Sequence, residues 1–330
     1  MKEILLKAEN VRAYYKLEKV SVKAVDGLSF EILEDEVIGV VGESGCGKTT
    51  LSNVIFMNMV KPLTLVDGKI FLRVNGDFVE LSSMTRDEVK RKFWGKEITI
   101  IPQAAMNALM PTIRMEKYVR HLAESHGIDE EELLEKARRR FEEVGLDPLW
   151  IKRYPFELSG GMRQRVMIAM ALACHPKLLI ADEPTSALDV TIQAEIIDLL
   201  DELRKSLGSS IVFISHDLAL LAEISDRIMV MYAGKVVELG DKNTIISEPK
   251  HPYTKAILES INYERKSRLK AIRGSIPSLI NPPRGCRFHP RCPFAMERCS
   301  VEEPRGSIDV KGRIVYCHLY EGGGDGGIKG

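Results

Sequence analysis

Short apolar runs alternate with longer amphipathic stretches along most of this chain. The runs contain many β-branched residues, which is typical of strands that are buried on both faces of a sheet. Strands that alternate with helices predict an α/β fold with a mostly parallel sheet covered on both faces. The predicted strands are residues 37–41, 178–182, 211–215 and 227–232, and the predicted helices are residues 48–59, 162–174 and 192–207. A further apolar run covers residues 98–102 and precedes Gln103.

Two other regions depart from this alternation. Residues 4–30 alternate apolar and polar positions, which predicts an antiparallel β subdomain, with turns at Asp67-Gly68 and Asn75-Gly76. Residues 115–152 instead show helical spacing of apolar positions, so we expect a helical insert over about residues 112–158. We therefore predict one nucleotide-binding domain over residues 1–245. The apolar positions of the insert are Leu133, Leu134, Ala137, Phe141 and Val144.

A glycine-rich segment follows the first predicted strand and fits the pattern G-x-x-x-x-G-K-[ST] of phosphate loops. In that pattern, backbone N–H groups surround the phosphates, the Lys neutralises them and the hydroxyl reaches Mg²⁺. A glycine-rich turn with a coincidental Lys is the alternative. The segment that we expect to bind ATP comprises Gly42, Glu43, Ser44, Gly45, Cys46, Gly47, Lys48, Thr49 and Thr50.

Two adjacent carboxylates end the strand predicted over residues 178–182. We expect Asp182 to hold Mg²⁺, because this ion keeps much of its hydration shell and needs few protein carboxylates. Glu183 is then placed to polarise the water that attacks the γ-phosphate. The alternative is that the two carboxylates are solvated charges at the start of a loop. The phosphate loop upstream argues against that interpretation.

A second candidate anion site lies at Ser159, Gly160 and Gly161, directly before a predicted helix. Free N–H groups and the positive end of a helix favour an anion there, although Ser159 also suits a simple N-cap. Because the chain already has one phosphate loop, two such sites suggest that one of them serves the ATP of a facing subunit. His216 follows another predicted strand and is a candidate γ-phosphate sensor; alone, such a His is more often structural.

This ordered set of motifs resembles the nucleotide-binding subunit of ATP-binding-cassette (ABC) transporters over about the first 240 residues. The sequence Leu-Ser-Gly-Gly at residues 158–161, followed by Gln164, is highly specific to that family. The resemblance implies a dimer with shared ATP sites. It also implies that Gln103, Thr49 and Asp182 contact Mg²⁺, that Gln103, Gln164, Asp189 and His216 belong to the ATP site, and that Tyr15, or its neighbour Tyr14, stacks on adenine.

Composition limits the remaining possibilities. Lys plus Arg and Asp plus Glu both number 47, so the chain lacks the net positive charge that favours nucleic-acid or anionic-lipid binding. Its apolar stretches are all shorter than the ~20 residues that span a bilayer, and its beginning lacks a signal-peptide pattern. We expect a soluble protein that stays in the cytoplasm, with any membrane part on another polypeptide.

Four of the six cysteines fall within 32 residues near the C-terminus. Clustered thiols in a cytoplasmic protein favour metal ligation over disulfides, and four thiolates suit either tetrahedral Zn²⁺ or a 4Fe–4S cluster. No C-x₂-C pair is present, so the spacing alone does not distinguish the two metals. The candidate ligands are Cys286, Cys292, Cys299 and Cys317.

The sequence around these cysteines resembles the C-terminal extension of oligopeptide/dipeptide ABC importer ATPases. The similar segments are His-Pro-Tyr-Thr-Lys-Ala at 251–256, Asn-Pro-Pro at 281–283 and His-Pro-Arg-Cys-Pro at 289–293. The resemblance favours a 4Fe–4S cluster over zinc and implies an extension over residues 246–320, followed by a flexible tail, 321–330. We expect the metal centre to be structural, because ATP chemistry needs no redox step. Because the extension lies outside every nucleotide motif, we expect loss of Cys292 to leave the ATP affinity of the cassette unchanged.

The same resemblance implies an ATPase that powers solute uptake at the cytoplasmic face of the cell membrane. Its expected partners are two transmembrane permease subunits, a second related ATPase or another copy of itself, and indirectly an extracellular solute-binding protein. Residues 104–111 and the helical insert are expected to receive a cytoplasmic helix of the permease. The alternative is a soluble ABC ATPase acting on ribosomes or DNA, but this chain has neither a second cassette nor a long coiled coil.

Overall fold

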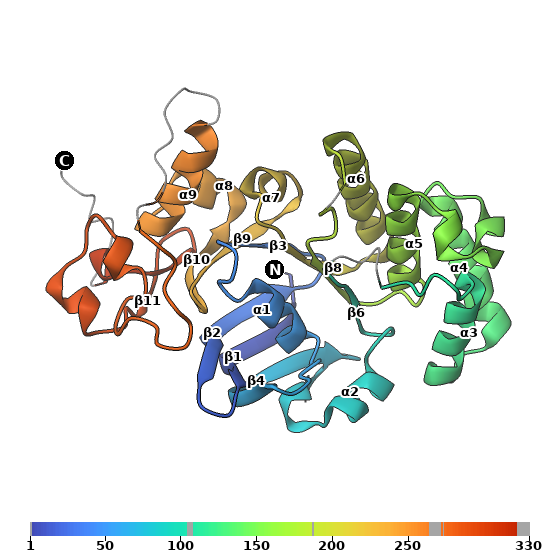
Figure 1. Cartoon of the computed structure of the whole chain (residues 1–330), viewed down its shortest axis with the longest axis horizontal. Helices are drawn as coiled ribbons and strands as arrows, with labels where there is room; N and C mark the ends of the chain where they lie inside the picture. The colour runs from blue at the N-terminus through green and yellow to red at the C-terminus, as the bar shows by residue number, and fades with distance from the viewer. Residues whose placement is uncertain (1, 104–107, 187, 264–271, 273, 322–330) are drawn as a thin grey trace.

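An eight-stranded sheet forms the centre of the molecule (Figure 1). The computed structural model describes residues 2–103, 108–186, 188–263, 272 and 274–321. Across the sheet, the strands are β11 (Gly306–Ile308), β12 (Ile314–Tyr316), β10 (Lys235–Asp241), β9 (Arg227–Tyr232), β3 (Val37–Val41), β8 (Ser210–Ile214), β7 (Leu178–Asp182) and β6 (Ile98–Ile101). Strands β9, β3, β8, β7 and β6 run parallel, whereas β10, β12 and β11 continue the sheet antiparallel.

The parallel strands are buried on both faces, as their continuous apolar sequence predicts. In β7, Leu179 and Ala181 join one hydrophobic core, while Leu178 and Ile180 join the other, because successive side chains point to opposite faces. Helices α6 (Val190–Leu207) and α7 (Leu218–Ile224) contribute to the first core, and α1 (Lys48–Ile55) contributes to the second. This arrangement confirms the predicted α/β fold.

A second, antiparallel sheet packs on α1 and confirms the β subdomain that the alternating N-terminal sequence predicts. Its order is β2 (Ser21–Leu33), β1 (Ile4–Lys16), β4 (Leu63–Val74) and β5 (Asp77–Glu80), and α2 (Arg86–Lys92) follows. Asn75 and Gly76 form the β4–β5 turn with φ values of 53° and 93°. The turn predicted at Asp67-Gly68 is wrong. That pair lies inside β4 at a bulge, where a side chain on Gly68 would strike the backbone of β1.

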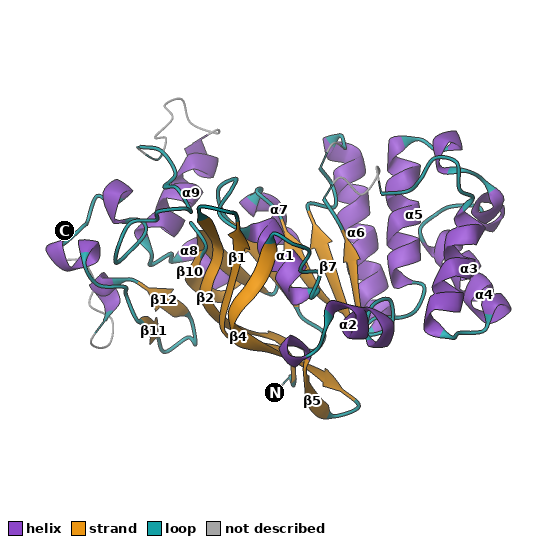
Figure 2. Cartoon of the chain, turned by 60° about the horizontal axis from the view of Figure 1, so that its bottom comes forward, coloured by secondary structure: helices purple, strands orange, loops and turns teal. Residues whose placement is uncertain are grey.

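Three helices extend the molecule at the end opposite the C-terminal segment (Figure 2). They are α3 (Met115–His126), α4 (Glu130–Glu143) and α5 (Gly160–Leu172). The five apolar positions that predict the insert, residues 133, 134, 137, 141 and 144, are all buried in one core with α5. The helical character of the insert is therefore confirmed, while its boundaries near residues 112 and 158 stay predictions.

The C-terminal segment continues the main sheet. After α8 (Lys242–Ser247) and α9 (Pro252–Tyr263), the chain returns as the β11–β12 hairpin, and Leu239 of β10 pairs with Ile314 of β12. Under this junction, Glu238 is fully buried and accepts backbone N–H bonds from Lys250 and His251 at 2.9 and 3.0 Å. Arg313 lies 3.5 Å from Glu238 and balances its charge.

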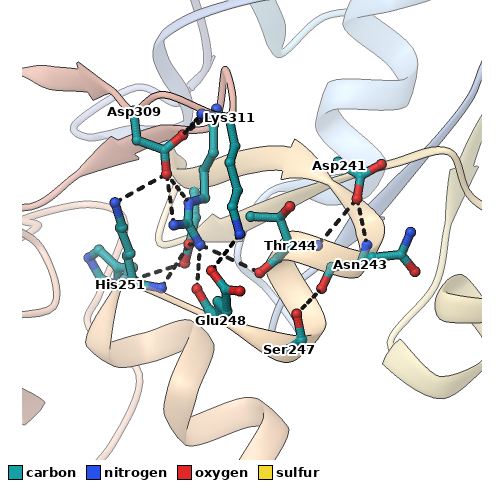
Figure 3. A network of polar contacts seen from close by, with 11 residues as sticks. Asp241, Asn243, Thr244, Ser247, Glu248, His251, Asp309 and Lys311 are labelled. Atoms are coloured by element: carbon teal, nitrogen blue, oxygen red, sulfur yellow. Dashed lines mark hydrogen bonds and ion pairs between the residues drawn. The ribbon is translucent and has the colours of Figure 1, made fainter. Parts of the chain in front are cut away.

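Figure 3 shows further polar contacts at this junction. Asp309 of the hairpin accepts from Arg313 Nε at 2.9 Å, and Lys311 Nζ donates to Glu248 at 2.7 Å. The side chain of Arg313 is only 2% exposed, so removing its partners would leave a buried charge uncompensated. The hairpin is thus bonded to the cassette through both backbone pairing and buried charges. The domain boundary near residue 245 stays a prediction.

Candidate functional site

The phosphate loop joins the end of β3 to the start of α1, as its sequence predicts. Gly47 adopts a left-handed conformation (φ 110°), and a Cβ there would lie 2.1 Å from the carbonyl oxygen of Ala24, so only glycine fits. Gly47 caps α1 without a side-chain hydrogen bond, which leaves N–H groups available to an anion. The side chain of Cys46 is buried, so only its backbone can face a phosphate.

Lys48 is 7% exposed and folds back onto its own loop. Its Nζ donates to the carbonyl oxygens of Gly42 at 2.6 Å and Glu43 at 3.2 Å. The ammonium group is therefore held beside the loop where a phosphate would be bound. Its charge there attracts an anion without any rearrangement of the helix.

Asp182 ends β7 and is almost completely buried. Its carboxylate accepts from Ser52 Oγ at 2.9 Å, and Thr49 Oγ1 lies at 3.5 Å. Burial raises the pKa of Asp182, although these two hydroxyl contacts oppose the shift. Sequence reasoning missed Ser52. Its position three residues after Thr49 on the same helix was the only available signal.

Glu183, Gln103 and His216 meet at one edge of the sheet. Gln103 Nε2 donates to Glu183 Oε2 at 3.3 Å, and His216 Nδ1 lies 3.3 Å from Glu183 Oε1. Because β6, β7 and β8 are parallel neighbours, their carboxyl ends bring these three side chains together. Glu183 has a φ of 49°, an uncommon conformation for a non-glycine residue.

A cavity of about 300 Å³ connects Gln103 and Glu183, but not His216, with the N-terminal β sheet. Tyr15 lines it and its hydroxyl lies 3.2 Å from Thr50 Oγ1, whereas Tyr14 donates to Asp26 at 2.5 Å. Tyr15 therefore lines the cavity and Tyr14 does not. The cavity is lined by Tyr15, Val22, Ala24, Ser44, Gly45, Gly47, Lys48, Thr49, Thr50, Gln103, Glu183 and Leu279.

The second candidate anion site does not line this cavity. Ser159 caps α5 and accepts from Met162 N at 3.3 Å, so the helix-cap alternative for its side chain is observed. Gly160 and Gly161 form the first turn of that helix, and Gln164 is buried in it. Asp189 caps α6 in the same manner. Of the two candidate anion sites, only the phosphate loop lines the cavity, and the site at residues 159–161 lies outside it.

The four C-terminal cysteines lie in one small region and form no disulfides. Cys286 N donates to the carbonyl oxygen of Cys299 at 2.9 Å, and burial raises the pKa of Cys317 to about 12, with the other three thiols adding to the shift. Among the residues that the structure describes, however, no group of three or more His, Cys, Asp or Glu side chains could hold a metal ion. The four-cysteine centre is not confirmed.

The C-terminal extension contacts the nucleotide motifs, and its expected independence from ATP binding stays a prediction. Arg291 bonds to Glu43 of the phosphate loop, and Leu279 lines the cavity. Sequence reasoning missed both residues, because nothing in the sequence links positions that are so far apart along the chain. The segment 104–111, which is expected to contact the permease, lies partly outside the described residues. Ala187, two residues before Asp189, and the tail beyond Glu321 lie outside them entirely.

Two family models match the chain. Residues 25–186 match the ABC transporter model, and residues 237–299 match the model described as "Oligopeptide/dipeptide transporter, C-terminal region". Within the described residues, a helix with the length and hydropathy of a membrane span is absent.

Curated relatives match over almost their whole length. The dipeptide transport ATP-binding protein DppD of Caldanaerobacter subterraneus subsp. tengcongensis is 42% identical, over 97% of this chain and 98% of that protein. The oligopeptide transport ATP-binding protein AppD of Bacillus subtilis is 40% identical, over 96% of this chain and 97% of its own length. A dimeric post-hydrolysis structure of the ATP-binding cassette MJ0796 with ADP and Pi has a TM-score of 0.62 at 26% identity, over 72% of this chain and 99% of that one.

Fold, site and matches define the class of this protein as an ATP-hydrolysing ABC cassette. The chain belongs to the ABC transporter family, in the group of ATP-binding proteins that carries the oligopeptide/dipeptide C-terminal region.

Proposed function

We propose that this chain is the ATP-hydrolysing subunit that powers uptake of peptides, or related solutes such as oligosaccharides, through a separate membrane permease. The observation that carries the proposal is its similarity to DppD, a dipeptide transport protein, along nearly the full length of both chains. The extension is included in that similarity. The alternative is an ATPase that acts on ribosomes or DNA. The relatives of this chain are transport proteins, and they do not support that alternative.

The proposed catalytic roles follow from the geometry. Glu183 holds the attacking water, because its carboxylate sits at the edge of the phosphate cavity. Gln103 and His216, both in contact with Glu183, orient the water and detect the γ-phosphate. Lys48 and the N–H groups of residues 44–50 bind the phosphates. Bound Mg²⁺ would neutralise developing phosphate charge, and Thr49, Gln103 and Asp182 are the residues proposed to hold it.

Ser159, Gly160, Gly161, Gln164 and Asp189 are proposed to act on the ATP of a facing ATPase. Support comes from their position outside the chain's own cavity and from the free N–H groups at the start of α5. The facing subunit is either a second copy of this chain or a related ATPase. Each of the two sites is then complete only in the dimer.

An apolar groove of about 690 Å³ between α2, α3 and α5 is proposed to receive the permease. Its lining includes Trp94, Tyr118, Leu122, Met167 and Met170. Methionines suit a surface that must adapt to a partner helix. Two permease subunits would hold the ATPases at the cytoplasmic face of the membrane, as peripheral subunits, with an extracellular solute-binding protein acting indirectly.

The cysteine-rich region is proposed to hold a 4Fe–4S cluster, with Zn²⁺ as the alternative. Support comes from the four thiols in one region of 32 residues and from the backbone bond between Cys286 and Cys299. Such a group would supply a structural cross-link through Cys286, Cys292, Cys299 and Cys317. Anaerobic purification with iron, sulfide and zinc analysis tests this. About four irons per chain supports the cluster, one zinc supports the alternative, and neither metal refutes both.

Transport itself is tested in proteoliposomes that contain this chain with its co-purified membrane proteins. We expect ATP-dependent peptide uptake that disappears with Glu183→Gln. Robust ATP hydrolysis by the assembled complex without uptake of any peptide or oligosaccharide would refute the transport assignment.

A further inference from the structure

Two side chains of the C-terminal extension hold Glu43, the second residue of the phosphate loop. The guanidinium of Arg291 makes a bidentate bond to the carboxylate, with Nη1 to Oε2 at 2.7 Å and Nη2 to Oε1 at 3.0 Å. The hydroxyl of Tyr253 accepts the backbone N–H of Glu43 at 2.9 Å. Glu43 is thus fixed through both its side chain and its backbone by residues far from it in sequence.

Both residues are themselves held by the surrounding protein. Tyr253 is fully buried, with its ring centroid 4.6 Å from Tyr232 and 5.4 Å from Phe288. The side chain of Arg291 is 5% exposed, and it also donates to the Tyr232 hydroxyl at 3.2 Å. The Glu43 side chain is 25% exposed, so the pair is shielded from water mainly on the Arg291 side. Its bidentate geometry makes it stronger and more directional than a single exposed ion pair.

Glu43 connects this contact to the residue that binds phosphate. Its carbonyl oxygen accepts from Lys48 Nζ at 3.2 Å, so any shift of Glu43 moves an acceptor of that ammonium group. Leu279 of the extension lines the nucleotide cavity together with Tyr15, and its carbonyl oxygen accepts Lys23 N–H at 2.9 Å. The extension therefore lines the cavity through Leu279 and contacts the adjoining loop residue Glu43 through Arg291 and Tyr253.

We propose that the C-terminal extension completes the ATP site, with Arg291 and Tyr253 as positioning residues of the phosphate loop. Holding the loop in its binding conformation before ATP arrives lowers the ordering cost of binding. Because coupling between two sites is reciprocal, bound ATP must then also stabilise the extension. This inference depends on one part of the proposed function, namely that ATP binds at the phosphate loop.

Affinity for MgATP tests the first half of this proposal. Calorimetry uses the full chain with Glu183→Gln, so that hydrolysis does not deplete the ligand. Arg291→Ala is expected to raise the Kd by about tenfold, with Arg291→Lys intermediate because it keeps the charge but loses the bidentate geometry. Tyr253→Phe, which removes only the hydroxyl, is expected to raise it by about threefold. The matched control is Arg298→Ala, which breaks ion pairs to Glu302 and Glu321 in the same extension and should leave the Kd unchanged.

Hydrogen exchange tests the reciprocal half. MgATP is expected to slow amide exchange at residues 286–292 in the parent and in the Arg298→Ala protein, but not in Arg291→Ala. A purely structural role for Arg291 would speed exchange equally with and without MgATP. That result, or an unchanged Kd in folded Arg291→Ala, overturns the inference.

If Arg291→Ala does not fold, Glu43→Gln provides the decisive variant, because it weakens the same pair from the cassette side. It should raise the Kd by a smaller factor and uncouple exchange at residues 286–292 from MgATP. An unchanged Kd and retained coupling overturn the inference. Failure of the parent itself to bind MgATP would instead refute the proposed function.

Discussion

The nucleotide site and the cysteine-rich region differ in how far the polypeptide alone assembles them. Gln103, Glu183 and His216 come from three separate strands, yet their side chains are already in hydrogen-bond contact. The four cysteines are much closer in sequence, yet among the described residues no group of three or more His, Cys, Asp or Glu side chains is arranged to hold a metal ion. Proximity in sequence is therefore a poor guide to which site is preformed.

The amount of supporting core explains this difference. Two hydrophobic cores hold the strands that carry the catalytic candidates, and parallel pairing fixes the relative positions of their ends. In residues 274–321, the buried apolar side chains are only Phe288, Cys299, Val315 and Cys317. A segment with so small a core depends on other sources of stability. The pairing of β12 with β10 and the buried charges of Arg313 are two of them, and metal binding would add a third.

The largest expected effect is a loss of turnover at the nucleotide site when Glu183 is changed. Glu183→Gln keeps the side-chain shape but removes the carboxylate that activates water, so turnover should fall by about 1,000-fold. ATP affinity should stay within a few-fold, and an ATP-bound dimer should accumulate. Lys48→Ala is the contrasting variant, because it should weaken ATP binding itself. Wild-type turnover in the Glu183→Gln complex would contradict the assignment.

A smaller effect is expected from the anion site that lies outside the cavity. Gly160→Asp places a negative charge at the start of α5, where it repels the partner's γ-phosphate, so turnover of the assembled dimer should fall by about 100-fold. ATP binding to the variant's own phosphate loop should be unchanged. A loss of that binding would show that residues 159–161 serve the chain's own nucleotide.

Loss of one thiol tests whether the cysteine-rich region depends on a metal. Cys292→Ser should release metal and speed hydrogen exchange over residues 286–317, because ligand binding in such sites is coupled to folding. Cys174→Ser, at a thiol outside the extension, is the matched control and should alter neither. Equal exchange in the two variants would show that the region is stable without a metal.

The smallest effect concerns the buried carboxylate. Because burial raises the pKa of Asp182 in the folded state, the nucleotide-free protein binds this proton more tightly than the unfolded chain does. The contribution of Asp182 to stability should therefore decrease as pH rises above the ordinary value of 3.8, towards the folded pKa. Asp182→Asn should stabilise the nucleotide-free protein at neutral pH by about 1 kcal/mol and weaken Mg²⁺ binding.

Thermal unfolding from pH 4 to 7 measures this effect. Asp189→Asn is the matched control, since Asp189 is exposed and Asn caps helices about as well as Asp. A destabilised Asp182→Asn protein would show that the hydroxyl contacts from Ser52 and Thr49 outweigh the cost of burying the charge.

Much of the fold was predictable from local sequence patterns. Strands 37–41, 178–182 and 227–232 have the predicted bounds, because continuous apolar runs specify burial on both faces. The helix predicted over 48–59 ends early, at Ile55. Met57 takes a left-handed conformation and Phe56 stacks on Trp94 at 4.4 Å, so the apolar residues continue after the helix stops.

The phosphate loop and the strand-end carboxylates were predictable because each follows a recognisable strand. The contacts of Ser52 with Asp182 and of Arg291 with Glu43 were not, since both depend on tertiary packing between distant segments. Periodicity and spacing describe a single element and its neighbours. They do not specify which side chain of a later segment reaches an earlier loop.

Turnover per chain as a function of protein concentration tests most directly the claim that each ATP site is completed by a facing subunit. The chain is diluted alone and together with the second ATPase with which it co-purifies, at saturating MgATP. We predict that turnover per chain falls towards zero on dilution, in parallel with loss of the dimer. Turnover that stays constant after the protein has become monomeric would contradict the account.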